Sequence, residues 1–239
     1  MVSRGRTYEW PRPALTVDVA LFTVRGTLNG LRLQVLLIRR GRAPFKGRWA
    51  LPGGFVREDE DLPAAAAREL AEETGVRGAV LEQVAAVGTP RRDPRGHTVT
   101  VAYVGLVAPD RHRLEPTGDS AAARWFDVGG PEPLPPLAFD HGELLRLAVA
   151  HMRRRVGEAP VCFDLLPADF TLSELQALLE TILGRPVDRR NFRRKVQELG
   201  FLAPTGGSRR EGAHRPAALY RFVPEEFAKR AARERALPF

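Results

Sequence analysis

The apolar and polar pattern of the first half of the chain predicts a mixed sheet with one helix inserted between its strands. Residues 16–24 (TVDVALFTV) and 31–40 (LRLQVLLIRR) are rich in apolar and β-branched side chains, and the turn-like RGTLNG between them indicates a hairpin. A helix is expected over residues 63–73, and the segment 129–140 is dense in proline and glycine. Further strands are expected at residues 79–88, 97–108 and 123–128.

The second half of the chain changes to a helical period with clear capping signals. Asp140, with Glu143 three residues later, predicts a capping box that opens a helix up to residue 156. Thr171 and Glu174 have the same spacing and open a second helix, which ends at Gly184.

A third helix follows, with Asp188 as its cap and Gly200 at its end. Residues 200–223 then form two short predicted strands joined by a glycine-rich basic loop. This order predicts an α+β protein, with an α/β/α sandwich over residues 1–155 and a winged helix-turn-helix over residues 156–239.

The net charge of +8 is informative because of where it lies. Residues 185–239 hold 14 Arg and Lys against 6 Asp and Glu, whereas residues 1–184 hold 23 of each sign. Such an asymmetry is typical of a module that binds a polyanion. Most of these basic residues are arginine, which favours bidentate contacts to phosphate or guanine.

Several classes of protein are not expected from the composition. No run of eighteen apolar residues is present, so no transmembrane helix is predicted, and residues 1–13 lack the apolar core of a secretory signal. The single cysteine, Cys162, is compatible with a reducing cytoplasm and is expected to fill a small apolar space.

Three glutamates lie within five positions of the helix at residues 63–73. Glu69, Glu72 and Glu73 share one helical face spanning about 100°, where like charges repel. A divalent cation would offset that repulsion, and Mg²⁺ prefers hard oxygen ligands. Gly53 and Gly54 lie upstream, where bare backbone can approach phosphate groups. The alternative is a solvated acidic face with no metal.

The spacing around these glutamates resembles the Nudix box of pyrophosphohydrolases. Gly54 is followed after five residues by Glu60, and after seven more by Arg68, Glu69, Leu70, Glu72, Glu73, Gly75 and Val76. The resemblance implies that Glu69, Glu72 and Glu73 ligate Mg²⁺ or Mn²⁺. The reaction it implies is the attack of a metal-activated water on a pyrophosphate phosphorus, with Glu73 among the catalytic residues. It further implies that Arg68 orients the carboxylates and that Glu60 is an outer ligand. The general base is not identified.

The helix at residues 189–199 has the pattern of a recognition helix. Phe192, Val196 and Leu199 form an apolar stripe, and Arg and Gln side chains on the other face could read base edges in a major groove. His214, in the hairpin loop, is expected to be a solvated loop residue. A solvated basic helix and a protein-binding winged helix are the alternatives. The predicted DNA-binding residues are Arg189, Arg190, Asn191, Arg193, Arg194, Lys195, Arg209, Arg210 and Arg215.

The two halves together resemble the Nudix-related transcriptional regulators of NAD metabolism, the NrtR-like proteins. The strings that carry the resemblance are RWALPGGFV, GTPRRDPRGHTVTVAYVGLV, PPLAFDH, FTLSELQALLETILG, RRNFRRK and RPAALYRF. The resemblance implies a Nudix domain that senses a ligand, usually ADP-ribose, and a winged helix that binds a palindromic operator as a homodimer. Ligand binding would then release the DNA.

Three further residues are candidate ligand contacts by this resemblance. Arg92 and Arg95 match the family's loop arginines and are expected to hold the diphosphate or a neighbouring ribose. Their alternative is a surface turn stabilised by Asp93 and Pro94. Trp49 is expected beside the nucleotide, with a place in the core as the alternative.

Two functions remain open from the sequence. Many regulators of this family carry an eroded box, whereas this box is whole. The chain is therefore either a DNA-binding repressor that senses ADP-ribose, or an active Mg²⁺-dependent ADP-ribose pyrophosphatase with a secondary tail, or a protein that does both and destroys its own effector. The arginine-rich tail favours the repressor, because an enzyme alone does not need it.

Overall fold

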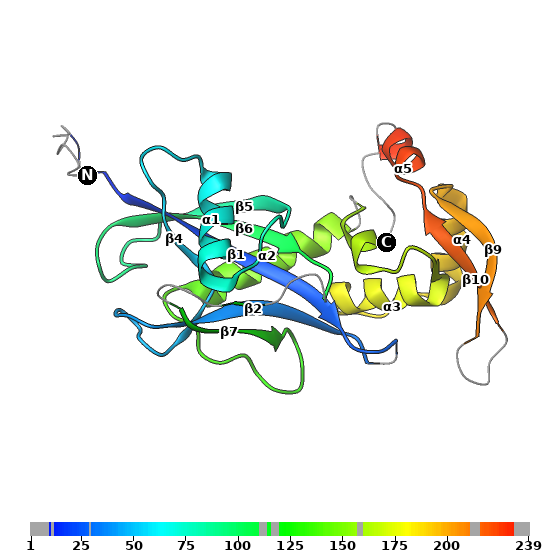
Figure 1. Ribbon diagram of the computed structural model, residues 1–239, viewed down its shortest axis with the longest axis horizontal. Helices are drawn as coiled ribbons and strands as arrows, with labels where there is room; N and C mark the ends of the chain where they lie inside the picture. The colour runs from blue at the N-terminus through cyan, green and yellow to red at the C-terminus, as the bar shows by residue number, and fades with distance from the viewer. Residues whose placement is uncertain are drawn as a thin grey trace.

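The structure of the 239-residue chain is a computed structural model. The structure describes residue 10 and residues 12–28, 30–109, 114–115, 120–156, 160–210 and 216–231. Its first half is a seven-stranded sheet between two helices, and its second half is a smaller helical unit with a three-stranded sheet (Figure 1).

The large sheet is built around β1 (Ala14–Arg25). The strand order is β3-β2-β1-β6-β5, with β4 paired to β1 and β7 paired to β2. β1 runs parallel to β6, from Ala14 opposite Thr98 to Phe22 opposite Leu106, whereas the other pairs are antiparallel. The other strands are β2 (Arg32–Arg40), β3 (Trp49–Ala50), β4 (Gly53–Phe55), β5 (Leu81–Val87), β6 (Thr98–Leu106) and β7 (Ser120–Asp127).

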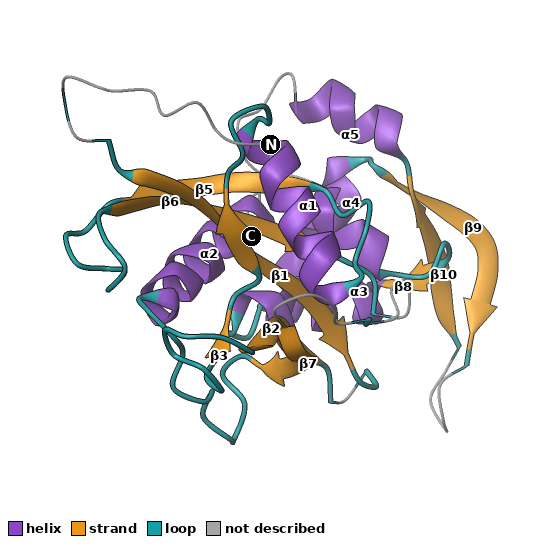
Figure 2. Cartoon of the chain, turned by 60° about the vertical axis from the view of Figure 1, so that its left-hand side comes forward, coloured by secondary structure: helices purple, strands orange, loops and turns teal. Residues whose placement is uncertain are grey.

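Alternation along β1 explains why both faces of the sheet are covered. Val17, Val19 and Leu21 face α1 (Leu62–Thr74), in a cluster with Ala65, Ala66 and Leu70. Ala20, Phe22 and Val24 face the opposite side, in a cluster with residues of α2 (His141–Val156). Because successive side chains of a strand point to opposite faces, one apolar strand supports both layers (Figure 2).

The second half contains the predicted helix-turn-helix and wing. α3 (Leu172–Leu183) opens with the Thr171–Glu174 capping box and ends at Gly184 in the left-handed conformation. α4 (Arg189–Leu199) is capped by Asp188 and ends at Gly200. The small sheet has the order β8-β10-β9. Its strands are β8 (Phe170–Thr171), β9 (Leu202–Arg209) and β10 (Ala217–Phe222). The short helix η1 (Pro160–Leu165) precedes this unit in the chain, and α5 (Pro224–Ala231) follows it.

One predicted cap is wrong. The Asp140 carboxylate accepts both of its hydrogen bonds from Arg92, and Glu143 accepts from Arg146, so the expected capping box of α2 does not form. The Asp140 carbonyl alone receives the N–H groups of Glu143 and Leu144. A partner 48 positions away in the sequence thus replaces a local contact.

Two other expectations concern Cys162 and the membrane. Cys162 is buried in the large core, and burial raises the pKa of its thiol to about 12, as expected for an apolar filler. Among the residues described above, no helix combines the length and the apolar character needed to cross a membrane.

Candidate functional site: an acidic helix facing an arginine wall

Local signals set the position of α1 and its glutamates. Asp61 caps the helix by accepting the Ala64 N–H at 2.8 Å, and Gly75 ends it with a φ of 81°. The buried face is formed by small and apolar residues, which leaves the glutamate face toward the β4 turn. β4 pairs with β1, so the two glycines are held beside residues 17 and 18 of that strand.

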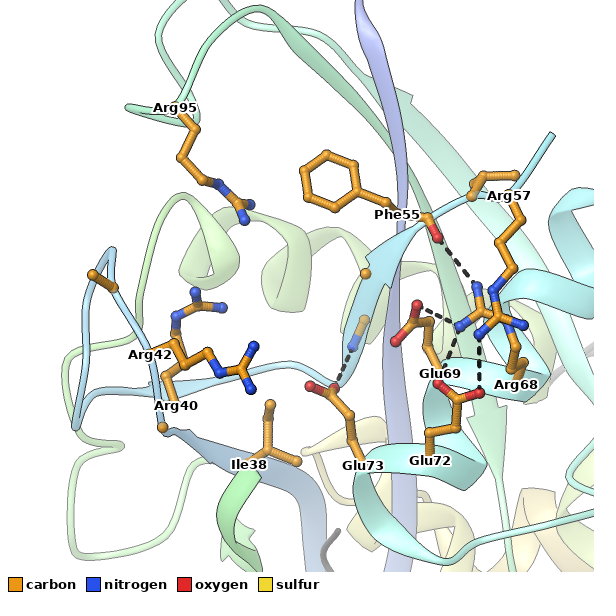
Figure 3. A pocket seen from close by; sticks show the side chains of 15 residues that line it. Ile38, Arg40, Arg42, Phe55, Arg57, Arg68, Glu69, Glu72, Glu73 and Arg95 are labelled. Atoms are coloured by element: carbon orange, nitrogen blue, oxygen red, sulfur yellow. Dashed lines mark hydrogen bonds and ion pairs between the residues drawn. The ribbon is translucent and has the colours of Figure 1, made fainter. Parts of the chain in front are cut away.

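A cavity of about 680 Å³ lies between the acidic face of α1 and a group of arginines (Figure 3). Glu69, Glu72 and Glu73 lie on one side. The β4 turn, from Gly53 to Arg57, forms a second wall. Across the opening from the carboxylates lie Arg40, Arg42 and Arg95.

The three box carboxylates have different environments. Glu73 accepts the Gly53 N–H at 2.8 Å, and burial nevertheless raises its pKa to about 8. Burial also raises the pKa of Glu69, against the hydrogen bond from Arg68. Glu72 is half exposed and lies 3.4 Å from Arg57.

Arg68 holds this acidic face together. Its Nη1 lies 2.7 Å from Glu69 and 3.2 Å from Glu72, while Nε and Nη2 bond Glu60 at 2.9 and 2.5 Å. The hydrogen bond from Arg68 lowers the pKa of Glu60 to about 2. Nη2 also donates to the Phe55 carbonyl at 3.1 Å. Arg68 thus contacts two of the carboxylates that it is predicted to orient, and Glu60 contacts Arg68 outside the cavity lining.

The donor set fits a hard divalent cation such as Mg²⁺. Three carboxylates line one wall, and a cation that keeps several waters needs few protein ligands. A Cβ on Gly54 would lie 2.5 Å from the Glu69 carboxylate, so a larger residue would displace that carboxylate. In the described part of the chain, no three Asp, Glu, His or Cys side chains are arranged so that they could hold a metal ion as they stand, so the three carboxylates would have to converge on the cation. Glu69, Glu72 and Glu73 would hold the cation, which would polarise a phosphoryl oxygen and activate water.

The cavity lining also contains residues that were not predicted, namely Arg40 and Arg42 opposite the carboxylates and Phe55 on the β4 turn. The Arg95 guanidinium lies 4.9 Å from the Phe55 ring centroid and is held by Asp93 at 2.6 Å. Phe55 remains 45% exposed on the cavity wall. Arg40 lies over the Phe139 ring at 4.8 Å. The density of arginine around residues 39–48 could have indicated this wall, whereas no local signal marks Phe55.

Two predicted ligand contacts lie outside the lining of the 680 Å³ cavity. The Arg92 side chain is 4% exposed and binds Asp140 through both Nε and Nη2, but it lines a smaller pocket of about 30 Å³ together with Gly53, Gly54 and Arg95. Trp49 packs edge-on against Phe126, with ring centroids 4.7 Å apart, and also lies outside that lining. The other predicted ligand residues, Gly53, Gly54 and Arg95, do line the cavity.

The predicted DNA-binding helix presents its polar face to solvent. Phe192 and Val196 are each 1% exposed, whereas Arg189, Arg190, Asn191, Arg193 and Arg194 are exposed and Lys195 is half-buried. Arg194 bonds Asn191 at 2.9 Å. The side chains of Arg190 and Arg193 form no hydrogen bond or ion pair with the described residues, so no contact in that part of the chain holds these two guanidinium groups away from a duplex.

The wing arginines are placed differently from one another. Arg209 is tied to Glu174 at 2.6 Å and to the Asp169 carbonyl at 2.8 Å, so it fastens the wing to the start of α3. Arg210 is exposed at the end of β9. The expectations for His214 and Arg215 concern positions outside the described residues.

Comparison with known proteins accounts for both halves. Residues 13–148 match the NUDIX domain, and residues 162–222 match the NrtR DNA-binding winged helix domain. A relative from Acinetobacter baylyi, the ADPR responsive transcriptional repressor NtrR, is 40% identical over 221 residues, which is 92% of this chain and 86% of that protein.

Two solved structures are also similar. Shewanella oneidensis NrtR in complex with a 27mer DNA has a TM-score of 0.69 and 36% identity, covering 90% of this chain and 95% of that chain. The NUDIX domain of the same NrtR in complex with ADP ribose has a TM-score of 0.53 and 35% identity, covering 62% and 94%. The chain therefore belongs to the NrtR family, in which a NUDIX domain precedes a DNA-binding winged helix domain.

Proposed function

We propose that this protein is a transcriptional repressor of NAD-metabolism genes that releases its operator when ADP-ribose binds. The observation that carries the proposal is one chain with two anion-binding surfaces of different kinds. The cavity joins carboxylates for a cation to arginines for phosphate, whereas α4 exposes arginines suited to a duplex. The similarity to an ADPR responsive repressor and to an NrtR–DNA complex supports the same pairing of ligands.

The proposal divides the chain into a sensor over residues 1–155 and a DNA-binding unit over residues 156–239. It includes a homodimer in the cytoplasm, because a palindromic operator requires two copies of α4. Mg²⁺ or Mn²⁺ at Glu69, Glu72 and Glu73 would bridge the protein to the diphosphate of ADP-ribose.

The first experiment removes two exposed arginines of α4, Arg190 and Arg193. The probe is a duplex that the wild-type chain selects from a random-sequence pool. Arg190→Ala with Arg193→Ala should weaken binding by about 1–3 kcal/mol for each base that the two side chains read. Log affinity should also fall less steeply with log salt, by about 0.9 for each phosphate that they neutralise.

The matched control removes two exposed arginines elsewhere, Arg77→Ala with Arg146→Ala. Its overall charge change is the same, so it should retain most of the affinity. Equal losses in both variants would mean that only net charge matters, and the assignment of α4 would be wrong. Duplex binding by the wild type that ADP-ribose leaves unchanged would rule out the sensor.

Hydrolysis is the second candidate function, and the complete set of box carboxylates around one cavity favours it. ADP-ribose with Mg²⁺ should then give AMP and ribose 5-phosphate, measured by chromatography of the products. Glu73→Gln should lower kcat by more than about tenfold, because it removes a ligand oxygen charge. Asp59→Asn, at an exposed position in the loop between β4 and α1, also removes one carboxylate charge and serves as the control. Absence of product with both Mg²⁺ and Mn²⁺ would leave sensing as the role of the cavity.

A further inference from the structure

Arg92 is buried next to the cavity, where it lines a pocket of about 30 Å³ that shares Gly53, Gly54 and Arg95 with the cavity. Its Nε and Nη2 lie 2.9 and 2.7 Å from the two Asp140 carboxylate oxygens, in bidentate geometry. Its Nη2 is also 3.6 Å from Asp18, whose Oδ2 accepts the Thr100 hydroxyl at 2.7 Å. Asp18 pairs with Gly53 across β1 and β4, and both line the small pocket with Arg92, so Arg92 lies beside the glycine turn.

Arg92 belongs to the same compact turn as Arg95, which lines the cavity. Asp93 accepts the Arg95 N–H at 2.9 Å and binds the Arg95 side chain, while the Arg92 N–H bonds the Thr89 carbonyl at 3.1 Å. Asp93 is 4% exposed. A ligand that pulls on Arg95 therefore acts on a turn whose other arginine holds Asp140.

Asp140 immediately precedes α2, and the far end of this helix reaches the DNA-binding half. α2 has 16 residues, about 24 Å at 1.5 Å per residue. Arg153 in its last turn donates to the Ile182 carbonyl of α3 at 3.1 Å. A Cβ on Gly184, which ends α3, would lie 2.5 Å from the Arg153 guanidinium, so the two helices meet closely at this point.

Packing makes α2 a stiff connection between these two ends. Leu144, Ala148 and Met152 are buried in one cluster with Leu178 and Ile182 of α3. Glu82 of β5 binds both His151 and Arg155, at 2.9 and 3.0 Å. A close-packed helix anchored at both ends moves as a unit rather than bending.

We propose that Arg92 is a positioning residue that couples the nucleotide cavity to α3 and α4 through Asp140 and α2. The inference rests on the proposed function, because coupling requires that both ADP-ribose and DNA bind. When a nucleotide contacts Arg95 and the glycine turn, the turn that contains Arg92 shifts. Because Arg92 binds Asp140, the start of α2 moves with this turn. The hydrogen bond of Arg153 to Ile182 then moves α3. The two ligands then favour different positions of α2.

The test measures a coupling factor in the full-length chain, which is the ratio of duplex affinities without and with saturating ADP-ribose. The duplex is the one selected by the wild type, and calorimetry gives the ADP-ribose affinity of each variant. Asp140→Asn breaks the charged pair at one end of α2, and Arg153→Gln weakens the hydrogen bond at the other end. Arg146→Gln removes an exposed pair with Glu143 on the same helix and is the control.

Coupling factors of about 5 to 150 are typical of allosteric proteins. We expect Asp140→Asn and Arg153→Gln each to reduce the wild-type factor at least fivefold, or to unity where it is smaller. ADP-ribose affinity and ligand-free duplex affinity should each change less than about threefold, and Arg146→Gln should behave as the wild type.

Two results would overturn the inference. Wild-type coupling in both α2 variants would show that the signal takes another route. If a variant loses coupling but also loses ADP-ribose affinity, ligand-free duplex affinity and thermal stability, the residue has a purely structural role. A wild type with no coupling would instead remove the proposed function, and this outcome is visible before any variant is made.

Discussion

At the scale of single residues, Phe55 is an aromatic ring on the wall of a cavity that is otherwise largely charged. Gly53 and Gly54 of β4 approach Asp18 and Glu69 closely, and the next residue, Phe55, places its ring beside Arg95. A ring with a guanidinium on one face offers its other face for stacking, which nucleobases use in many protein sites.

We predict that Phe55 stacks on the adenine of the nucleotide. Phe55→Ala should weaken ADP-ribose binding about 5- to 150-fold, since base stacking contributes about 1–3 kcal/mol. Inorganic pyrophosphate with Mg²⁺ has no base, so it should bind the wild type and Phe55→Ala with equal affinity. Phe55→Tyr keeps the ring and should bind as the wild type in calorimetry. Equal weakening of both ligands by Phe55→Ala would instead indicate a distorted cavity.

At the scale of the elements, His141 joins the start of α2 to the turn before β4. Its Nδ1 accepts the Leu51 N–H at 2.9 Å, and its Nε2 lies 3.4 Å from Asp18. Burial lowers the pKa of His141; the nearby Arg92 and Arg40 act in the same direction, whereas Asp18 and Asp140 oppose it. The folded protein therefore holds a neutral imidazole.

The sign of the pH effect follows from this lowered pKa. Between the folded pKa and the unfolded value of about 6.5, the unfolded chain binds a proton that the folded chain does not. The free energy of unfolding should therefore fall as the pH drops below about 6.5. Between pH 7.5 and 5.5 we expect His141 to account for a loss of up to about 1.4 kcal/mol.

Urea unfolding at both pH values measures this loss, with His141→Gln as the reference. Glutamine can still accept the Leu51 N–H through its side-chain oxygen but does not titrate. The wild type should lose more stability than the variant on acidification. Parallel losses in the two proteins would contradict the assigned state of His141.

The elements also show where sequence patterns are sufficient. The Thr171–Glu174 box and the glycine ends of α3 and α4 were predicted and are present, because each contact joins residues within one or two turns. The Asp140 box failed although its pattern was equally good, because a buried arginine competes for the same carboxylate. Short elements such as β3 and β8 were missed, since two residues carry no period.

At the scale of the whole molecule, the two halves share one core. A single cluster contains Phe22 and Leu37 of the large sheet together with Leu178 of α3 and Phe192 of α4. α2 lies between them, so the sensor and the DNA-binding unit are packed together as well as linked in sequence (Figure 1).

We therefore predict that the two halves unfold together. All three tryptophans lie in the first 125 residues, so their fluorescence reports only on the first half. Leu178→Ala, in α3, should reduce stability by about 2–5 kcal/mol and lower the urea midpoint of that fluorescence. A fluorescence midpoint that stays unchanged while helical circular dichroism is lost earlier would show that the halves unfold independently.

The sequence by itself determined the elements, their order, the acidic face of α1 and the arginine face of α4. These features depend on alternation, helical spacing and caps, which act over a few residues and survive in any arrangement of the chain. The tertiary structure alone decided which side chains meet across long separations. It paired Arg92 with Asp140, brought Arg40 and Phe55 into the lining of the cavity that holds Glu69, and joined Arg153 to the end of α3. Such pairings depend on the packing of distant elements, which no local pattern encodes.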